Sequence, residues 1–232
     1  MIKCDLYKIA KWFYESGVSD ITGDAPLRQR SSKNEITTLG ELRAIMDRVD
    51  ISIKDCAFNM VFGVGNEDAD ILLLGEAPGA EEDKQGIPFV GQSGQLLDKI
   101  LAAIGLDRTK VYITNILPWR PPGNRTPTTE EIALFRPYVL KHISIINPKI
   151  LVCLGGTASK ALLQTNQSMT QLRGKWTQVD GIRAEILPTF HPAYLLRSPS
   201  QKREAWIDFL MVKQKISELN GPLKNETSPI KE

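Results

Sequence analysis

The sequence has few cysteines, and they lie too far apart to form a disulfide framework or a CxxC metal motif. Cys4, Cys56 and Cys153 are therefore expected to be reduced thiols in a cytoplasmic protein. The sequence also lacks the apolar core of a signal peptide and any run of about 18 apolar residues. We expect neither export nor a membrane span.

Neither sign of charge is in excess, because 29 lysines and arginines nearly balance 27 aspartates and glutamates. No strong overall field then draws the protein to nucleic acid or to a membrane, so a nucleic-acid partner would need a local basic rim. The chain has 232 residues, of which 42% are hydrophobic. This is enough for one sizeable core and excludes disorder of the whole chain.

Short apolar runs alternate with amphipathic helices from residue 70 onward, a pattern typical of a parallel sheet covered on both faces. We predict a three-layer α/β/α fold with a central, mostly parallel four-stranded sheet. The predicted strands are 71–75, 111–115, 149–155 and 184–190, and the predicted helices are 93–106, about 129–146, 156–163 and 205–219.

The first 57 residues are interpreted as a helical and loop extension that packs on the α/β domain of residues 58–218. Helical spacing of apolar residues predicts one helix at 5–16. A second helix is expected to begin after Thr38, which can cap it with Glu41 as the reciprocal partner, and to run to about Val49. The remainder, 219–232, has little apolar content and is predicted to be a flexible tail.

Polar and glycine residues stand at the end of every predicted strand. The four strands end in GEAPG, TN, LGG and FHPAY. Because open parallel sheets bind ligands beyond the carboxyl ends of their strands, these residues should converge at one edge. The sequence therefore predicts a pocket centred on Glu76, Asn115 and His191.

Three side chains at this edge could recognise or act on a planar ligand. Phe89 lies in a loop rich in glycine and proline, where its ring could stack on a ligand or anchor the loop in the core. The amide of Asn115 matches the edge of a nucleobase, although alone it is more often a turn former. His191, before Pro192, could act near pH 7 or be structural.

Basic residues and leucines border the same predicted edge. In AYLLRSPSQKR, leucines beside cations suggest a wedge that enters DNA while cations hold phosphates, whereas a capping loop would explain the leucines but not the cations. Arginines in the proline-stiffened WRPPGNRTP suit phosphate or structural carboxylate contacts equally well. The candidate DNA-binding residues are Arg120, Arg125, Arg173, Lys175, Leu195, Leu196 and Arg197.

Five segments, taken in order, closely resemble the bacterial and archaeal family 4 uracil-DNA glycosylases over about residues 58–213. They are GEAPGAEEDKQGIPFVGQSGQLLDKIL, VYITNILPWRPPGNRTP, LVCLGGTASKALL, RGKW and FHPAYLLR. The resemblance implies a monofunctional DNA repair glycosylase that flips uracil out of double- or single-stranded DNA. Such an enzyme hydrolyses the N-glycosidic bond and leaves an abasic site.

The resemblance also implies roles for single residues. Phe89 would stack on uracil, Asn115 would pair with its polar edge, and the backbone from Gly75 to Ala77 would contact its carbonyl groups. His191 would stabilise the negative charge that develops on uracil O2.

A carboxylate is expected to orient the attacking water and to stabilise the oxocarbenium character of the sugar. Glu76 and Glu82 are both candidates, and Asp83 is a weaker one.

One departure from the family concerns metal. Typical members hold a four-iron four-sulfur cluster with four cysteines, and the aligned positions here are Thr22, Ala25, Trp119 and Phe135. Since thiolates are the required ligands, we expect no cluster and no other cofactor. Trp119 and Phe135 should instead pack apolar surface where the metal would lie.

Of two alternative functions, one stays open and the other is disfavoured by the sequence. The chain could be a catalytically weak DNA-lesion-binding module of the same fold. An unrelated nucleotide-binding hydrolase is disfavoured, because the sequence has no GxxxxGK[ST] loop. Hypoxanthine and xanthine remain further candidate substrates, and the protein is expected to be a monomer.

Overall fold

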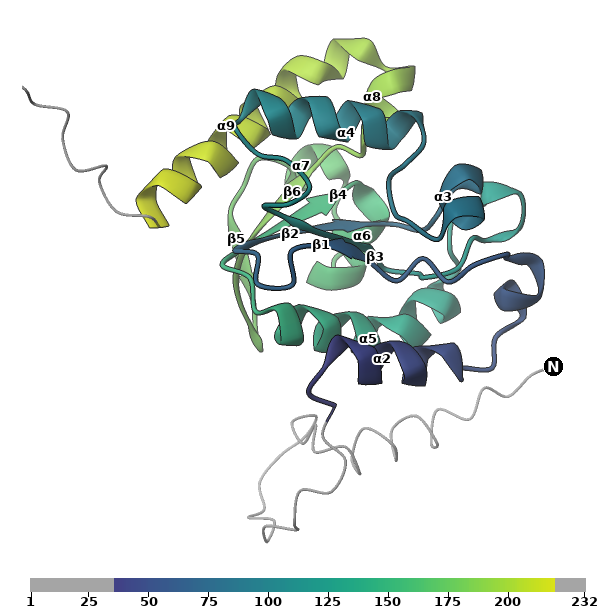
Figure 1. Cartoon of the computed structure of the whole chain (residues 1–232). Coiled ribbons are helices and arrows are strands. Elements are labelled where there is room, and N and C mark those ends of the chain that lie inside the picture. Colours follow the sequence, from purple (N-terminus) through teal and green to yellow (C-terminus); the bar gives the residue numbers. More distant parts are fainter. Residues whose placement is uncertain (1–35, 220–232) are drawn as a thin grey trace, which may run out of the picture.

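The short apolar runs of the sequence form the centre of a sheet. The computed structural model describes residues 36–219, and within them the strand order is β1-β3-β2-β4-β6-β5 (Figure 1). Each of the four inner strands runs parallel to its inner neighbours. They are β3 (Tyr112–Asn115), β2 (Ile71–Gly75), β4 (Ile150–Leu154) and β6 (Ile182–Thr189). The predicted α/β/α fold and its four parallel strands are confirmed.

The predicted number of strands is wrong, because an antiparallel strand lies at each edge of the sheet. β1 (Val64–Gly65) pairs with β3, and β5 (Thr177–Val179) pairs with β6. The sheet therefore has six strands within the described residues. β1 has only two residues and carries no periodic signal. β5 is joined to β6 through Asp180 and Gly181, and an Asp-Gly pair is a recognised hairpin signal.

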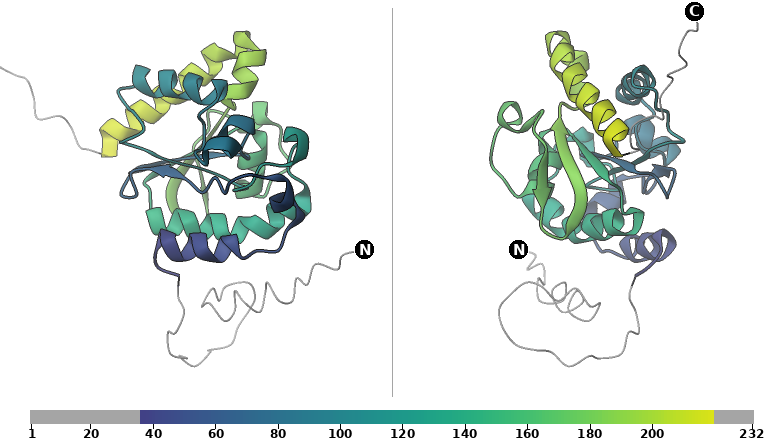
Figure 2. Two further views of the ribbon diagram at one scale, coloured as in Figure 1. Left: turned by 45° about the vertical axis from the view of Figure 1, so that its right-hand side comes forward. Right: turned by 90° about the vertical axis from the view of Figure 1, so that its left-hand side faces the viewer.

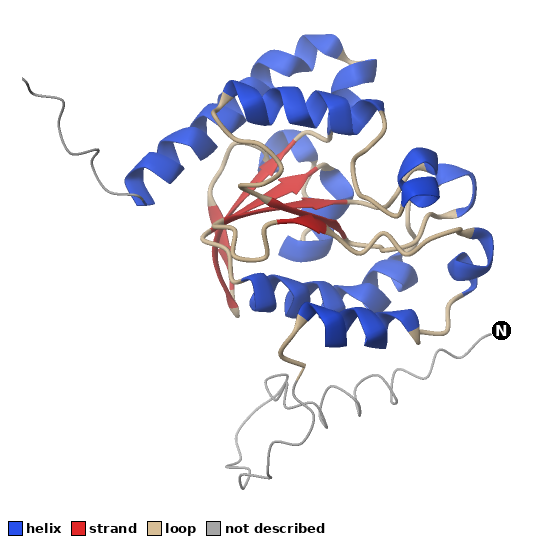
Figure 3. Ribbon diagram, in the orientation of Figure 1, coloured by secondary structure: helices blue, strands red, loops and turns tan. Residues whose placement is uncertain are grey.

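Alternate residues of the inner strands pack against opposite helix layers. Leu72 and Leu74 share one core with helices α2, α5 and α6, whereas Ile71 and Leu73 share another with α4 and α9. Burial on both faces explains why these strands are continuous apolar runs. Figures 2 and 3 show α4 and α9 on one side of the sheet and α2 and α5 on the other. The bounds are α2 (Leu39–Asp47), α4 (Gln92–Ala103), α5 (Thr129–Ile146), α6 (Gly156–Leu163) and α9 (Lys202–Leu219).

Short helices complete the carboxyl edge of the sheet. α3 (Ala80–Gln85) follows β2, and α8 (Pro192–Arg197) follows β6. The others are α7 (Met169–Leu172) and 3-10 helices at Ser52–Cys56, Pro122–Asn124 and Pro199–Gln201. The positions that follow the strands are therefore fixed by local helical turns.

The predicted helix after Thr38 is confirmed as α2. The Thr38 hydroxyl accepts from the Glu41 amide at 3.2 Å, and the Glu41 carboxylate accepts from the Thr38 amide at 3.1 Å. α2 buries Leu42 completely in the core that it shares with α5. The predicted helix at 5–16 and nearly all of the predicted tail lie outside the described residues. Among the described helices, none is both long enough and apolar enough to cross a membrane.

Candidate active site

A crevice of about 710 Å³ opens where the inner strands end. It is lined by Glu76, Phe89, Asn115 and His191, so the structure brings together the residues on which the predicted pocket was centred. Ala77, Glu82, Arg125 and Arg197 line it as well. Sequence reasoning assigned no site role to several other lining residues: Ser93, Pro121, Asn124, Thr126, Met169, Thr170 and Tyr194.

Gly75 allows the side chains of Asn115 and Phe89 to meet above the end of β2. A Cβ atom at position 75 would lie 2.3 Å from Asn115 Oδ1 and 2.7 Å from the Phe89 ring. Both distances are too short for real contacts, so only glycine fits without displacing these side chains. Gly75 thus contributes to the pocket by its lack of a side chain, although it does not line the crevice.

The side-chain amide of Asn115 is buried with an unused acceptor. Asn115 is 5% exposed, and its Oδ1 has no hydrogen-bond partner within residues 36–219. Burying an unpaired acceptor costs about 1–3 kcal/mol, and such atoms are rare in folded proteins. Because the residue lines the crevice, an N–H group of a ligand could satisfy this oxygen.

His191 presents a hydrogen-bond donor in its neutral form. Its Nδ1 accepts from the Ala193 amide at 3.1 Å and caps α8, so the proton of the neutral ring is assigned to Nε2. Burial, together with the cationic charge of Arg197, lowers the pKa of His191 to about 4. The imidazole is therefore neutral at pH 7, with an Nε2–H available for an acceptor.

Phe89 lies beside His191 in a strained backbone conformation. The two ring centroids are 5.5 Å apart, and the rings are inclined by 31°. Phe89 has φ of 56°, in the left-handed region that bulky residues rarely adopt. A non-glycine residue in this region at a pocket indicates that surrounding contacts hold it there.

The two candidate carboxylates differ in what they contact. Glu82 accepts from three backbone amides: Oε1 from Val90 at 3.0 Å and Gly91 at 2.9 Å, and Oε2 from Gly79 at 3.2 Å. The Glu76 carboxylate has no hydrogen-bond or ion-pair partner in the described part of the chain and is half-buried in the crevice. Only Glu76 therefore has both oxygens uncommitted.

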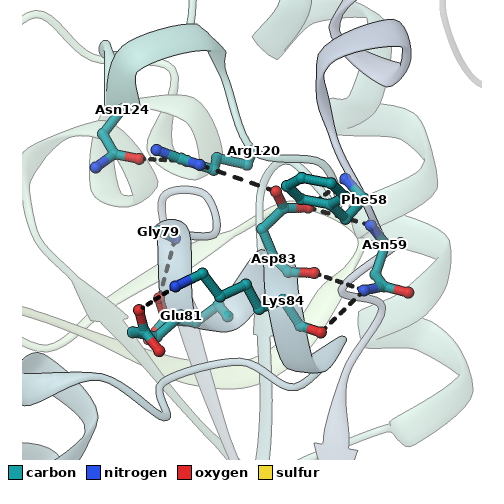
Figure 4. Close-up of polar contacts among 9 residues, drawn as sticks. Phe58, Asn59, Gly79, Glu81, Asp83, Lys84, Arg120 and Asn124 are labelled. Atoms are coloured by element: carbon teal, nitrogen blue, oxygen red, sulfur yellow. Dashed lines mark hydrogen bonds and ion pairs between the residues drawn. The ribbon is translucent and has the colours of Figure 1, made fainter.

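Asp83, the next residue of α3 after Glu82, contacts two neighbouring segments of the chain (Figure 4). It is fully buried, and its Oδ1 accepts from the amides of Phe58 at 2.8 Å and Asn59 at 3.1 Å. Its Oδ2 has no hydrogen-bond partner and lies 4.0 Å from an Arg120 nitrogen. Arg120 in turn donates to Asn124 Oδ1 at 2.6 Å. Asp83 thus has a structural role between α3 and two neighbouring segments.

The arrangement is consistent with a known family of proteins. A family model described as the uracil DNA glycosylase superfamily matches residues 62–210. The chain belongs to this superfamily. The matched residues include every wall of the crevice described above.

Individual members of the superfamily cover most of the same sequence. A type-4 uracil-DNA glycosylase of Archaeoglobus fulgidus is 39% identical over 186 residues, which are 78% of this chain and 92% of the relative. A type-4 uracil-DNA glycosylase of Thermotoga maritima is 46% identical over 146 residues, with 62% and 75% covered. A type-5 uracil-DNA glycosylase of Pyrobaculum aerophilum is 27% identical over 146 residues, with 56% and 64% covered.

In this uracil-DNA glycosylase superfamily chain, the predicted DNA-binding cations lie in different settings. Arg125 and Arg197 line the crevice, whereas Arg120, Arg173 and Lys175 do not. Arg125 forms two hydrogen bonds with Glu131, at 2.8 and 2.6 Å. Arg197 is exposed and has no hydrogen-bond or ion-pair partner among residues 36–219. Its guanidinium group is uncommitted.

Arg173 is tied into the interior of the fold. Its guanidinium group donates to both carboxylate oxygens of Asp208, at 3.1 and 2.6 Å, and to Glu204 at 2.7 Å. Asp208 is fully buried and also accepts from the Thr189 hydroxyl at 2.7 Å. Arg173 and Asp208 therefore link α9 to Thr189, the last residue of β6, two residues before His191.

The expectation of two exposed leucines holds for one of them. Leu196 is 40% exposed on α8, but Leu195 is 1% exposed and packs with Phe190 and Ala205. The expected exposure of Leu195 is therefore wrong. Successive residues of a helix point in different directions, so α8 turns Leu195 inward and Leu196 outward.

Trp119 and Phe135, at which the resemblance leads us to expect cluster ligands, have side chains that do not fit an iron–sulfur cluster. Trp119 and Phe135 are buried, with ring centroids 5.6 Å apart, and the Lys54 ammonium group lies 4.9 Å from the Trp119 ring. None of these side chains can supply a thiolate. Cys153 is buried in β4, where burial raises the pKa of its thiol, and Cys56 is exposed. Thr22 and Ala25 lie outside the described residues.

Proposed function

We propose that this chain excises uracil from DNA by flipping the nucleotide into the crevice and hydrolysing its N-glycosidic bond, which leaves an abasic site. The observation that carries the proposal is the buried Asn115 amide, with its unpaired Oδ1, in a crevice also lined by an aromatic ring and a neutral histidine. Membership of the superfamily supports the same reaction. Base flipping brings the glycosidic bond within reach of these groups.

Asn115 has the donor and acceptor that uracil requires. The amide oxygen would accept from uracil N3–H, and the amide nitrogen would donate to the neighbouring carbonyl oxygen O4. Cytosine has an acceptor at N3 and a donor at C4, so the same amide orientation would oppose like groups. Phe89 would stack on the base, and the backbone of Gly75 and Ala77 would contact its carbonyl groups.

His191 would assist departure of the base. When the bond between C1′ and N1 breaks, its electron pair moves onto uracil and negative charge develops on O2. The Nε2–H of the neutral imidazole would stabilise that charge through a hydrogen bond. Removing one such donor typically lowers the rate by about 10²–10³-fold.

We infer that Glu76, rather than Glu82, orients the attacking water. The free oxygens of Glu76 support this role, whereas both oxygens of Glu82 already accept from backbone amides. We expect Glu76→Gln to lower the excision rate with little change in thermal stability. Glu82→Gln should lower both the excision rate and the thermal stability. If both variants keep full single-turnover excision, the carboxylate assignment fails.

The DNA around the flipped nucleotide would contact the rim of the crevice. Arg197, which lines the crevice without a partner among residues 36–219, would meet a phosphate, as would Arg125 beside its partner Glu131, and the exposed Leu196 would occupy the space that the flipped base leaves. Arg173, whose donors are satisfied internally, is better suited to positioning β6. We further propose that the protein acts as a cytoplasmic monomer.

A single-turnover excision assay tests the function. Duplex and single-stranded DNA containing uracil, hypoxanthine or xanthine would be compared with thymine controls, for wild type, His191→Ala and Asn115→Ala. We expect uracil release by wild type and losses of about 100-fold or more in both variants. A wild type that binds these lesions but releases no base would instead identify a lesion-binding module.

We also infer that the protein works without an iron–sulfur cluster. The aromatic packing of Trp119 and Phe135 supports this, because it replaces ligands with apolar contacts. Iron and acid-labile sulfide would be measured in protein purified without oxygen. Stoichiometric amounts of both would overturn the inference.

A further inference from the structure

Two charged side chains hold the loop that carries Phe89, one by binding its backbone amides and the other by binding its backbone carbonyl groups. Glu82 accepts from the amides of Val90 and Gly91, which follow Phe89. Arg108 donates to the carbonyl oxygens of Pro88, at 3.0 Å, and of Phe89 itself. Across four consecutive residues, 88–91, the Arg108 guanidinium group thus binds the carbonyl groups of the first two, and the Glu82 carboxylate binds the amides of the last two.

Arg108 is itself fixed in direction. Its Nε donates to Asp98 Oδ1 on α4 at 2.7 Å, and its side chain is 27% exposed. One planar group thus contacts a carboxylate with Nε and two successive carbonyl oxygens with its two terminal nitrogens. Lysine cannot reproduce this geometry, because its single ammonium nitrogen has no fixed fork of donors.

The Phe89 loop requires such contacts because its backbone conformation is unfavourable. The φ of 56° at Phe89 lies in a region that aromatic residues rarely adopt. The Phe89 carbonyl also lies against Gly94 in the first turn of α4, where an added Cβ would lie 1.6 Å from its oxygen. Arg108 binds this same carbonyl oxygen. Loss of the guanidinium group would remove two of the hydrogen bonds that hold this loop, and we expect the ring to move as a result.

We propose that Arg108 is a positioning residue for base excision, acting through Phe89. It holds the Phe89 backbone in the left-handed conformation that sets the ring beside His191. The inference deepens the proposed function and rests on it, because Phe89 is the stacking surface for the flipped base. Arg108 does not line the crevice and touches no reacting atom.

A double-mutant cycle tests this role. Wild type, Arg108→Ala, Phe89→Ala and the double variant would be compared by single-turnover excision of uracil, together with their thermal stability. We expect Arg108→Ala to slow excision by about 10- to 100-fold, as misplacement of a positioned group by about 1 Å can do. In the Phe89→Ala background, the same change should cost less than about twofold, because residues that act as one unit are not additive. Equal factors in both backgrounds would overturn the proposal.

Two further variants separate positioning from loss of charge. Arg108→Lys keeps the cation but should recover less than half of the lost rate on a logarithmic scale. Lys110→Ala is the matched control, since Lys110 is a nearby exposed cation whose contacts are with Asp107 and the Gly105 carbonyl. Its excision rate should equal that of wild type. Full recovery of the rate by Arg108→Lys would overturn the role of the fork geometry.

Hydrogen exchange distinguishes this inference from the proposed function. The Val90 and Gly91 amides should exchange faster in Arg108→Ala than in wild type or Lys110→Ala, whether or not the protein is active. Unchanged exchange in an active enzyme would overturn the positioning role. Faster exchange in a protein that releases no uracil would leave the structural role intact and contradict the proposed function.

Discussion

The two sides of the crevice differ in how their polar groups are held. On the side formed by residues 75–91, which we term the base wall, charged groups bind backbone: Glu82 binds three amides, Asp83 binds two, and Arg108 binds two carbonyl groups. On the side formed by α8, which we term the rim helix, Arg197 has no partner within residues 36–219 and Leu196 is 40% exposed. The comparison indicates that the base wall is preorganised, whereas the rim helix keeps groups uncommitted, as the proposed contacts with a flipped base and with DNA would require.

The largest effect is expected from removing the buried Asp83 carboxylate of the base wall. Asp83→Ala leaves the Phe58 and Asn59 amides unpaired and Arg120 without its buried counter-charge. We expect the free energy of unfolding to fall by about 3–4 kcal/mol, as for other buried pairs that lose one partner. Urea denaturation measures it. Glu81→Ala, an exposed carboxylate on the same helix, should change it by less than about 0.5 kcal/mol.

Gly75→Ala tests whether the base wall tolerates displacement. The added methyl group would overlap Asn115 Oδ1 and the Phe89 ring, so both must move. We expect single-turnover excision to slow by about 100-fold, equivalent to about 2.7 kcal/mol. Gly40→Ala is the control, because a Cβ at position 40 meets nothing within 4 Å. A Gly75→Ala enzyme with wild-type excision would show that the wall is not preorganised.

The pH dependence of stability tests whether the His191 side chain is buried, like the base wall, or exposed, like the rim helix. Burial lowers to about 4 the pKa of His191 and also that of His142, a buried residue of α5. As the pH falls below the ordinary value of about 6.5, the unfolded chain binds protons before the folded one does. The free energy of unfolding should therefore fall between about pH 6.5 and 4, by about 2 kcal/mol per histidine near pH 4.5.

Denaturation of His142→Phe over the same pH range isolates the contribution of His191. We expect about half of the wild-type pH dependence to persist in this variant. If no pH dependence remained in this variant, His191 would be solvent-exposed, like the residues of the rim helix.

Arg197→Ala tests the rim helix itself. Loss of one phosphate contact should weaken DNA binding by about tenfold at low salt and reduce the slope of log affinity against log salt by about one unit. Fluorescence anisotropy over a salt series measures both quantities. Arg183→Ala removes an exposed cation from β6 outside the crevice and should leave both unchanged.

Leu196→Ala should have the smallest effect. A side chain that fills the space of a flipped base matters in duplex DNA, where stacking must be replaced, and less in a single strand. We expect excision from duplex DNA to slow by about threefold, with single-stranded DNA unchanged. Equal slowing on both substrates would contradict this role for Leu196.

Much of the fold could be predicted from the sequence, because its central elements bury continuous or periodic apolar residues. The boundaries of β2 and α5 agree with the predicted ranges 71–75 and 129–146. β1 was missed because its two residues depend on pairing with β3 rather than on local preference. The convergence of Glu76, Asn115 and His191 followed from topology, since parallel strands end at one edge.

The finer contacts of the site could not be predicted in the same way. Glu76 and Glu82 both lie in GEAPGAEED, and their different contacts depend on how the loop folds back to residues 90–91. Nothing in the sequence around Arg108 indicates that it binds carbonyl groups 19 and 20 residues earlier. Leu195 and Leu196 could have been told apart only by recognising α8 as a helix.

The left-handed backbone of Phe89 has a consequence for the evolution of this loop. At such a position, glycine or asparagine is conformationally easier than phenylalanine. The Phe89 ring is nevertheless 6% exposed and packs in one core with Ile71 and Leu73. A smaller residue would relieve the backbone strain but lose these buried apolar contacts. Residue 89 is thus a position at which backbone strain, core packing and the proposed stacking surface cannot all be improved by one substitution.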